Sequence, residues 1–401
     1  MINSDRVLIF EDNLSGHRAK YAAVLAQALV DLKADVVLAI PEVVSDSYHE
    51  LLDPVLKSVE IFPVESSEVQ SRTGRQRLNL LRRVVDSVGP KHVYVPYADG
   101  LSQTWGSLVF PRKCFASGII FEGLMMRGSY AYPAASKMMM IKNWISLQLI
   151  KRSKWDRIHQ LDPIALEKIQ GQNLIEKDRN VVIPEIIETP SERGYSAACE
   201  DLNLDTECRY VSCPGLQSRR KGIDLLLAAF EKMVQQESEE SNCRLLLFGQ
   251  HSNEIREALK GRYKTLIESR RIISRDGLLS ENDFEALFCA SEVVCVPYPR
   301  HIGSASILIR AARLGKKVLA SDWGWVGWTT KKYAIGETCD VKDSEEFAKL
   351  LSRVTGADYP GPAQWREFAD LRSDFLQFHT GKNYSDCFTD IYCKRHEIRV
   401  K

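Results

Sequence analysis

Short apolar runs that alternate with longer helical patterns constrain this chain more than any other feature. After each run come residues that can return as a helix, which is the pattern of a doubly wound parallel sheet. The sequence therefore predicts an α/β fold. The runs span residues 6–10, 34–40, 59–62, 92–96 and 118–123, and then 180–184, 209–215, 244–249, 271–277, 292–297 and 316–321.

The series of runs is interrupted between residues 186 and 207, where the chain is polar and lacks a sustained apolar period. A length of 401 residues suits two domains, each with its own core. We therefore predict one Rossmann-like domain over 1–187 and a second over 207–375. Because open α/β sheets bind ligands at the carboxyl ends of their strands, the residues directly after each strand are the candidate site residues.

Charge and composition argue against several classes of protein. Lys and Arg total 54 against 53 for Asp and Glu, so no basic field favours a nucleic acid partner. The ten cysteines are scattered without a CxxC pair, which indicates reduced thiols. The chain passes directly from MINSD into an apolar strand, and it has no apolar run of membrane-spanning length. We expect a cytoplasmic protein.

Several cofactor and metal motifs are absent from the sequence. The histidines are dispersed, and no HxH, HExxH or Cys/His spacing suggests a metal site. Neither the GxxxxGK[ST] loop of NTPases nor the GxGxxG of dinucleotide enzymes occurs. We expect no bound metal and no cofactor.

Three segments of the C-terminal half carry a resemblance in both order and spacing. They are VSCPGLQSRRKGIDLLLAAFEKM at 211–233, RDGLLSENDFEALFCASEVVCVPYP at 275–299 and IGSASILIRAARLGKKVLASDWG at 302–324. Together they resemble the retaining GT-B glycosyltransferases that use nucleotide-sugar donors, over roughly residues 209–340. The resemblance implies two Rossmann-like domains facing a cleft, and a C-terminal helix within 376–401 that returns to the N-terminal domain.

A lysine followed by a glycine opens the helix after the run at 209–215. In the family this lysine, here Lys221, neutralises the departing diphosphate. Arg219 and Arg220 add donors suited to phosphate oxygens, and Gly215 provides the preceding turn. The alternative is a solvated basic turn.

A second phosphate contact is predicted at the start of the helix after the run at 292–297. The small residues Gly303, Ser304, Ala305 and Ser306 enter an apolar helix, whose free backbone N–H groups form an anion site. A simple helix cap is the alternative.

The sequence departs from the family at the sugar end of the donor site. Arg310 stands where the family carries its second glutamate, and the first glutamate is also absent. We therefore place Arg310 among the donor-binding residues. Trp323 and Trp325 are candidates for stacking on the sugar, with packing in the core as the alternative.

The N-terminal half offers candidates directly after its strands. Gly16 and His17 open the first helix and could contact the donor, although helix capping explains them equally well. Asp99 follows the run at 92–96 and Glu122 lies at the end of the run at 118–123, and both are candidates for acceptor binding or acid–base catalysis. The alternatives are a turn-forming role for Asp99 and a structural hydrogen bond for Glu122.

The segment 134–155 combines apolar residues with lysines and an arginine. Such a basic amphipathic helix can lie on the inner face of an anionic membrane, which would suit a lipid-linked acceptor. The alternative is packing on its own sheet.

The leading hypothesis is metal-free transfer of a sugar from a nucleotide donor to a glycan or lipid-linked acceptor, and the resemblance implies retention at the anomeric carbon. A non-catalytic binding or scaffold protein of the same fold is one alternative, and the missing glutamates favour it. A sugar-nucleotide epimerase of similar fold is another.

Overall fold

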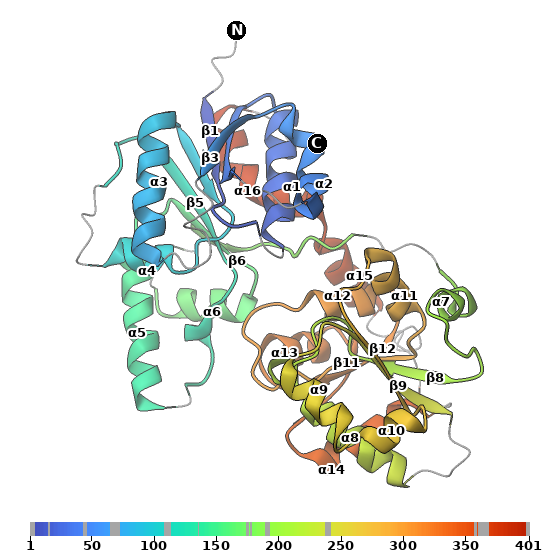
Figure 1. The fold of residues 1–401 in the computed structure, drawn as a ribbon. Helices are drawn as coiled ribbons and strands as arrows, with labels where there is room; N and C mark the ends of the chain where they lie inside the picture. The colour runs from blue at the N-terminus through green and yellow to red at the C-terminus, as the bar shows by residue number, and fades with distance from the viewer. Residues whose placement is uncertain are drawn as a thin grey trace. The chain divides into compact units, whose positions relative to one another are not determined.

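The computed structural model describes residues 5–14, 17–42, 46–64, 73–107, 114–134, 136–173, 176, 179–188, 193–236, 242–356, 359 and 369–397. The chain divides into two compact units (Figure 1). Residues 1–186 and 379–401 form unit 1, and residues 187–378 form unit 2. The C-terminal segment therefore returns to unit 1.

Unit 1 contains a seven-stranded parallel sheet in the order β3-β2-β1-β4-β5-β6-β7. The strands are β1 (Arg6–Phe10), β2 (Asp35–Pro41), β3 (Glu60–Val64), β4 (His92–Val95), β5 (Ile120–Met125), β6 (Arg157–Gln160) and β7 (Asn180–Val182). The order reverses between β1 and β4, which pair with Val7 opposite His92.

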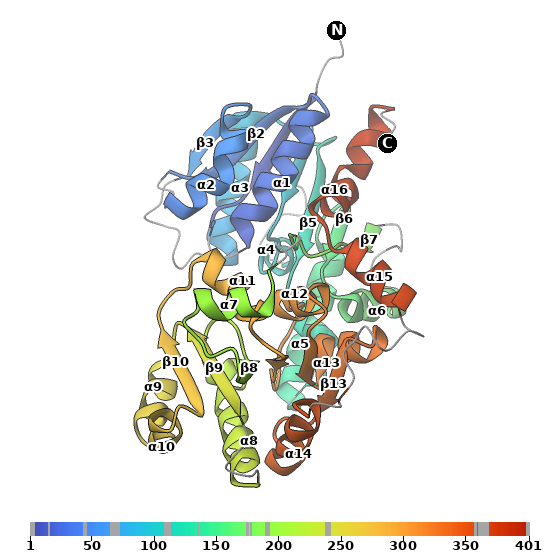
Figure 2. The ribbon, with the colours of Figure 1, turned by 90° about the vertical axis from the view of Figure 1, so that its right-hand side faces the viewer.

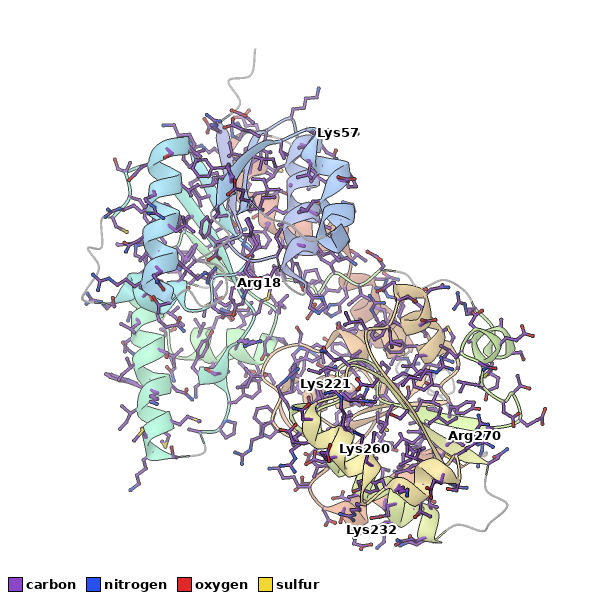
Figure 3. The ribbon with its side chains drawn as sticks, in the orientation of Figure 1. Arg18, Lys57, Lys221, Lys232, Lys260 and Arg270 are labelled. Atoms are coloured by element: carbon purple, nitrogen blue, oxygen red, sulfur yellow. The ribbon has the colours of Figure 1, made fainter. Side chains whose placement is uncertain are left out.

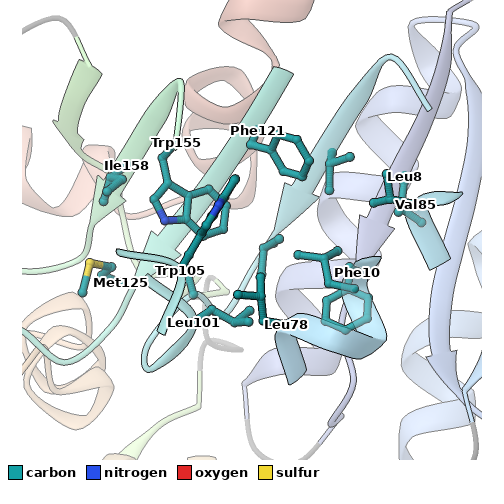
Figure 4. Close-up of a cluster of buried hydrophobic side chains, with 14 of the residues drawn as sticks. Leu8, Phe10, Leu78, Val85, Leu101, Trp105, Phe121, Met125, Trp155 and Ile158 are labelled. Carbon is teal, nitrogen blue, oxygen red and sulfur yellow. The ribbon is translucent and has the colours of Figure 1, made fainter. Parts of the chain in front are cut away.

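Two layers of helices cover this sheet, with a separate apolar cluster on each side. On one side α3 (Gly74–Val88), α4 (Leu101–Gly106) and part of α5 (Lys137–Arg152) enclose Phe10, Trp105, Phe121 and Trp155 (Figure 4). On the other side α1 (Arg18–Asp31) packs with α2 (Asp46–Leu56) and with α16 (Gly381–Arg395), as Figure 2 shows for α1 and α16. Because both faces are covered, the strands read as continuous apolar runs.

Unit 2 contains a six-stranded parallel sheet in the order β10-β9-β8-β11-β12-β13. The strands are β8 (Arg209–Ser212), β9 (Cys243–Gly249), β10 (Ile272–Asp276), β11 (Val293–Val296), β12 (Lys317–Ser321) and β13 (Gly336–Cys339). Here the order reverses between β8 and β11. The helices include α8 (Ile223–Gln236), α9 (Asn253–Lys260), α11 (Glu281–Cys289), α12 (Ser306–Arg313), α13 (Gly324–Lys332), α14 (Ser344–Val354) and α15 (Ala369–Phe378).

The segment between the two predicted domains contains a helix that the sequence pattern did not indicate. Residues Tyr195–Asp201 form helix α7, which packs on α11 of unit 2. Ala198 and Cys199 are buried in a cluster with Leu202 and Phe248. The helix is too short to show an apolar period in the sequence, so only its tertiary packing reveals it.

Candidate functional site

The candidate phosphate-binding residues of unit 2 meet at the point where its strand order reverses. Because β8 and β11 are neighbours, the segments that follow them lie side by side at the carboxyl edge of the sheet. Gly215 comes after β8 and Gly303 after β11, with positive φ angles of 95° and 94° that favour glycine. Such a reversal point is where open α/β sheets bind ligands.

Lys221 ends a short 3-10 turn, Arg219–Lys221, directly before α8 (Figure 3). Its Nζ lies 3.5 Å from the carbonyl oxygen of Pro214 and 5.5 Å from the ring centroid of Tyr298. No carboxylate in the described part of the chain forms an ion pair with it. Burial, followed by the positive charge of Arg220, lowers the pKa of Lys221. A half-buried ammonium of this kind is suited to bind an anion.

Gly222 brings the two segments of the site into direct contact. Its φ is 70°, and a Cβ at this position would lie 1.9 Å from the carbonyl oxygen of Pro297. A side chain here would therefore force the turn that carries Lys221 away from the segment after β11. The glycine sets the distance between Lys221 and Tyr298.

The start of α12 provides backbone donors near the same edge of the sheet. Ala305 occupies the N-cap position, and no side chain caps the helix. The ring of His301 lies within hydrogen-bond distance of the carbonyl oxygen of Ser304, at 2.9 Å from Nε2, which holds the turn before the helix. The N–H groups of the first turn of such a helix can bind an anion.

Arg310 lies near these residues, but its guanidinium already forms an ion pair with a carboxylate. Its guanidinium lies 2.9 Å from Glu281 at the start of α11 and 5.4 Å from the ring centroid of Phe284. Phe284 in turn lies 3.9 Å from the place where a Cβ on Gly215 would stand. Arg219 is more exposed than Lys221, with 71% of its side chain accessible, and Arg220 is also exposed.

The structure places the three tryptophans between residues 323 and 328 in different settings. Trp325 is only 2% exposed and lies among the largest fully buried side chains, so our prediction that it stacks on a sugar was wrong. Trp323 is half-buried at the N-cap of α13. Trp328 contacts the ring of Tyr333 edge-on and lies beneath Lys332.

The reversal point of the sheet in unit 1 holds a cluster of charges that the sequence did not single out. Glu11 and Asp12 follow β1 directly, and both are buried. Arg77 of α3 binds Asp12, with Nε 2.9 Å from each carboxylate oxygen. It also donates to the carbonyl oxygens of Tyr97 and Asp99 after β4. This arginine therefore joins the segments that follow β1 and β4.

Arg18, the first residue of α1, faces the same cluster (Figure 3). Its guanidinium lies 3.4 Å from the ring centroid of Tyr97 and 3.7 Å from Glu11. Burial raises the pKa of Glu11 to about 8, although the charge of Arg18 opposes the shift. His17, predicted to contact the donor, is exposed at the N-cap of α1, and Gly16 lies outside the described residues.

Asp99 lies after β4, as the sequence predicted, and it connects two loops. Its carboxylate accepts hydrogen bonds from the backbone N–H groups of Met126, at 3.0 Å, and Arg127, at 3.4 Å. Burial raises its pKa to about 6, and these two hydrogen bonds oppose the rise. Its position ties the residues after β5 to those after β4.

Glu122 does not lie at the end of its strand, contrary to our prediction. It lies inside β5, is fully buried, and its two carboxyl oxygens lie within hydrogen-bond distance of Nε2 of His92, at 2.8 Å, and Nε2 of His159, at 2.9 Å. Burial raises the pKa of Glu122 well above its ordinary value and lowers those of both histidines. This geometry matches the structural hydrogen bond that was the alternative. The strand extends to Met125, two residues beyond the predicted run.

Two further observations concern metals and membranes. Within the described ranges, no group of three or more His, Cys, Asp and Glu side chains is arranged to hold a metal ion. None of the helices that the structure describes has the length and apolar character needed to cross a bilayer.

A family model matches part of the C-terminal half. Residues 209–356 match the model described as glycosyl transferases group 1. This match covers β8 to α14 and includes Lys221, Gly303 and Arg310. A search of curated protein sequences found no match.

Solved structures resemble both halves of the chain. A sucrose-phosphate synthase from Thermosynechococcus elongatus has a TM-score of 0.70 at 17% identity, covering 99% of this chain and 100% of that one. A glycosyltransferase from Rickettsia africae has a TM-score of 0.66 at 15% identity and covers 98% of both chains. Anabaena HepE in complex with UDP and glucose has a TM-score of 0.65 at 13% identity, covering 97% and 100%. The chain has the GT-B fold.

Proposed function

We propose that this protein is a glycosyltransferase that moves a sugar from a nucleotide-sugar donor to a glycan or lipid-linked acceptor. The observation that carries the proposal is Lys221, a half-buried cation with no described carboxylate beside it, at the reversal point of the sheet in the region that matches glycosyl transferases group 1. Similar structures contain UDP with glucose and UDP-2-fluoro glucose. A UDP-sugar is therefore the first donor to test.

In this mechanism negative charge develops on the diphosphate as the bond to the sugar breaks. The ammonium of Lys221 and the first-turn N–H groups of α12 would stabilise that charge, and they act more strongly where burial excludes water. Because a lysine and backbone donors can do this, the proposal includes no metal and no cofactor. Retention at the anomeric carbon is part of the proposal and rests on the family resemblance.

On the acceptor side, we propose that the charged cluster at the reversal point of unit 1 binds a polar acceptor. The guanidinium of Arg18 lies over the ring of Tyr97, 3.4 Å from its centroid, and its planar set of N–H donors suits a polar acceptor. Asp99, with a pKa raised to about 6, is the acid–base candidate in this unit. Glu122 is excluded from contact with an acceptor by its burial and its two histidines.

A non-catalytic binding protein of the same fold is the second candidate function. It is favoured by the arginine at position 310, because the family carries a carboxylate there and the guanidinium is already paired with Glu281. In that case the site would still bind a nucleotide but would not transfer its sugar.

Calorimetric titration of UDP, GDP, ADP and their sugars distinguishes the two. We expect one nucleotide to bind the wild type, and Lys221→Ala to weaken it about tenfold to a hundredfold, the value of a charge-assisted hydrogen bond. Lys260→Ala, an exposed lysine of α9, is the matched control. Slow hydrolysis of the bound donor supports the transferase. Binding without hydrolysis or transfer supports the binding protein, and no binding by any nucleotide rules out the donor site.

A further inference from the structure

Exposed apolar side chains concentrate at one place in unit 1, the first half of α5. Of the large hydrophobic side chains that are exposed in the described residues, six lie between residues 138 and 145, and five are dispersed elsewhere. Isolated exposed apolar residues are normal, but a contiguous group marks an interaction surface. The six are Met138, Met139, Met140, Ile141, Trp144 and Ile145, with exposures from 42% to 66%.

This half of the helix extends beyond the body of unit 1. Leu147 and Ile150, in the second half, are buried against α4 and the core of the sheet. The first half runs on past α4, as Figure 1 shows. Four of its apolar residues share a stripe, because Met138, Ile141 and Ile145 recur at helical spacing and Trp144 lies beside them. Packing on its own sheet therefore accounts for the second half of α5 alone.

The charged residues of α5 and of the segments that flank it in the chain are all of one sign. Between Glu122 and Asp156 the sequence contains no Asp or Glu, although the whole chain is balanced at 54 basic and 53 acidic residues. Lys137 and Lys142 are exposed within the first half of α5, and Lys151 and Lys154 are exposed beyond its second half. The basic residues of this stretch are Arg127, Lys137, Lys142, Lys151, Arg152 and Lys154.

A surface that is both apolar and basic fits an anionic lipid bilayer. The apolar face of an interfacial helix enters about 5–10 Å into the boundary between headgroups and acyl chains, while its lysines stay with the headgroups. Tryptophan prefers this boundary because its ring is apolar and its N–H is polar. A protein partner would need acidic groups facing the lysines as well as an apolar pocket.

We propose that the first half of α5, Lys137–Ile145, docks on the surface of a bilayer that contains anionic lipids. Met138, Ile141 and Trp144 enter the boundary region, and Lys137 and Lys142 contact the headgroups. The contact is peripheral. This proposal does not depend on sugar transfer, since it concerns a surface far along the chain from Lys221.

Co-sedimentation with vesicles tests the proposal on the full chain. We expect binding to phosphatidylcholine mixed with phosphatidylglycerol, and little binding to phosphatidylcholine alone. The triple variant Met138→Ser, Ile141→Ser, Trp144→Ser should bind the mixed vesicles at least about tenfold more weakly. The matched control is Leu278→Ser, which removes an apolar side chain that is 91% exposed in unit 2.

A second pair of variants tests how much the lysine charges contribute to vesicle binding. Lys137→Glu with Lys142→Glu should weaken binding to the mixed vesicles about tenfold or more, and added salt should weaken the wild type in the same direction. Lys57→Glu with Lys260→Glu makes the same change of net charge at exposed lysines elsewhere and should bind like the wild type.

The fluorescence of Trp144 measures directly whether its ring enters the bilayer. Vesicles should shift tryptophan emission to shorter wavelength in the wild type and much less in Trp144→Phe.

Two results would overturn the proposal. One comes from co-sedimentation: either the wild type and the α5 variants bind vesicles equally, or the wild type does not bind the mixed vesicles. The other is light scattering that shows a dimer of the wild type and a monomer of the triple variant, which would assign this surface to a second copy of the chain. Nucleotide titration of each variant shows that the fold is intact, and it separates failure here from failure of the donor site.

Discussion

The two sheets have the same strand order around their reversal points, but they differ in whether the charged side chains at those points are paired. In unit 1, Asp12 and Arg77 are buried and bind each other, and Arg77 also binds backbone carbonyls. In unit 2, Lys221 is half-buried beside Tyr298 and forms no ion pair with a described carboxylate. Compensated charges hold two loops together. A cation without a counter-charge is suited to an anion supplied from outside the chain.

The largest effect predicted from this comparison is the loss of Arg77. Arg77→Met removes the guanidinium that binds the buried carboxylate of Asp12, and breaking a buried ion pair typically costs about 3–5 kcal/mol of unfolding free energy. Urea unfolding, followed through hydrogen exchange of the β1 and β4 amides, measures the cost. Arg83→Met, an exposed position on the same helix, is the control. Equal stability of the two variants would show that the ion pair does not hold the loops.

The next effect concerns Lys221 and appears only with ligand present. We expect Lys221→Met to unfold at the same urea concentration as the wild type without nucleotide. With a nucleotide at a hundred times its dissociation constant, the wild type gains about 2.7 kcal/mol, whereas affinity lowered tenfold to a hundredfold reduces that gain by about 1.3–2.3 kcal/mol. A loss of stability without ligand would mean that Lys221 serves the fold, as Arg77 does.

A more gradual effect, smaller per pH unit, should appear as pH dependence in unit 1. The folded protein keeps a proton on Glu11 up to about pH 8, whereas the ordinary value is 4.5. Between these values the folded state binds more protons than the unfolded state, so the unfolding free energy falls as pH rises, by at most about 1.4 kcal/mol per pH unit. Glu11→Gln should remove this component. Glu42→Gln, an exposed carboxyl, should retain it, and identical pH profiles for both variants would contradict the shift.

The smallest effect is predicted for Arg310. Because Glu281 is 66% exposed in its side chain, their ion pair should contribute only about 0.2–1 kcal/mol. Arg310→Gln therefore tests ligand binding with little change in stability. If Arg310 contacts the sugar of the donor, calorimetry should show that the substitution weakens binding of the nucleotide sugar more than it weakens binding of the bare nucleotide, each compared with the wild type. An equal change for both ligands would assign Arg310 to the phosphate end.

Most strands were predictable from the sequence because both faces of each sheet are covered. The run at 6–10 coincides with β1, and the others agree within a few residues. The sequence did not predict strand β13, Gly336–Cys339, because it is an edge strand whose residues are mostly half-buried and polar. It has no apolar run to signal it, and only its pairing with β12 defines it.

The candidate site was predictable in unit 2 more than in unit 1. Lys221 and Gly303 follow their strands, and the structure brings their segments together through β8 and β11. In unit 1 the contact between Asp12 and Arg77 joins residues far apart in the chain, which no local pattern reports. The position of Glu11 and Asp12 directly after the first apolar run was the available signal, because strand ends carry the site residues in this fold.

The return of the chain to unit 1 has a consequence for biosynthesis. Unit 2, residues 187–378, is inserted before the last segment of unit 1, so the ribosome finishes it first. Helix α16 packs on α1, with Tyr384 lying 4.9 Å from Tyr21 between ring centroids. Until residues 381–395 emerge, that face of α1 lacks the helix α16 that packs on it. The N-terminal half of the molecule is thus the last to complete its core, and a nascent chain stalled after unit 2 would expose an apolar surface to chaperones.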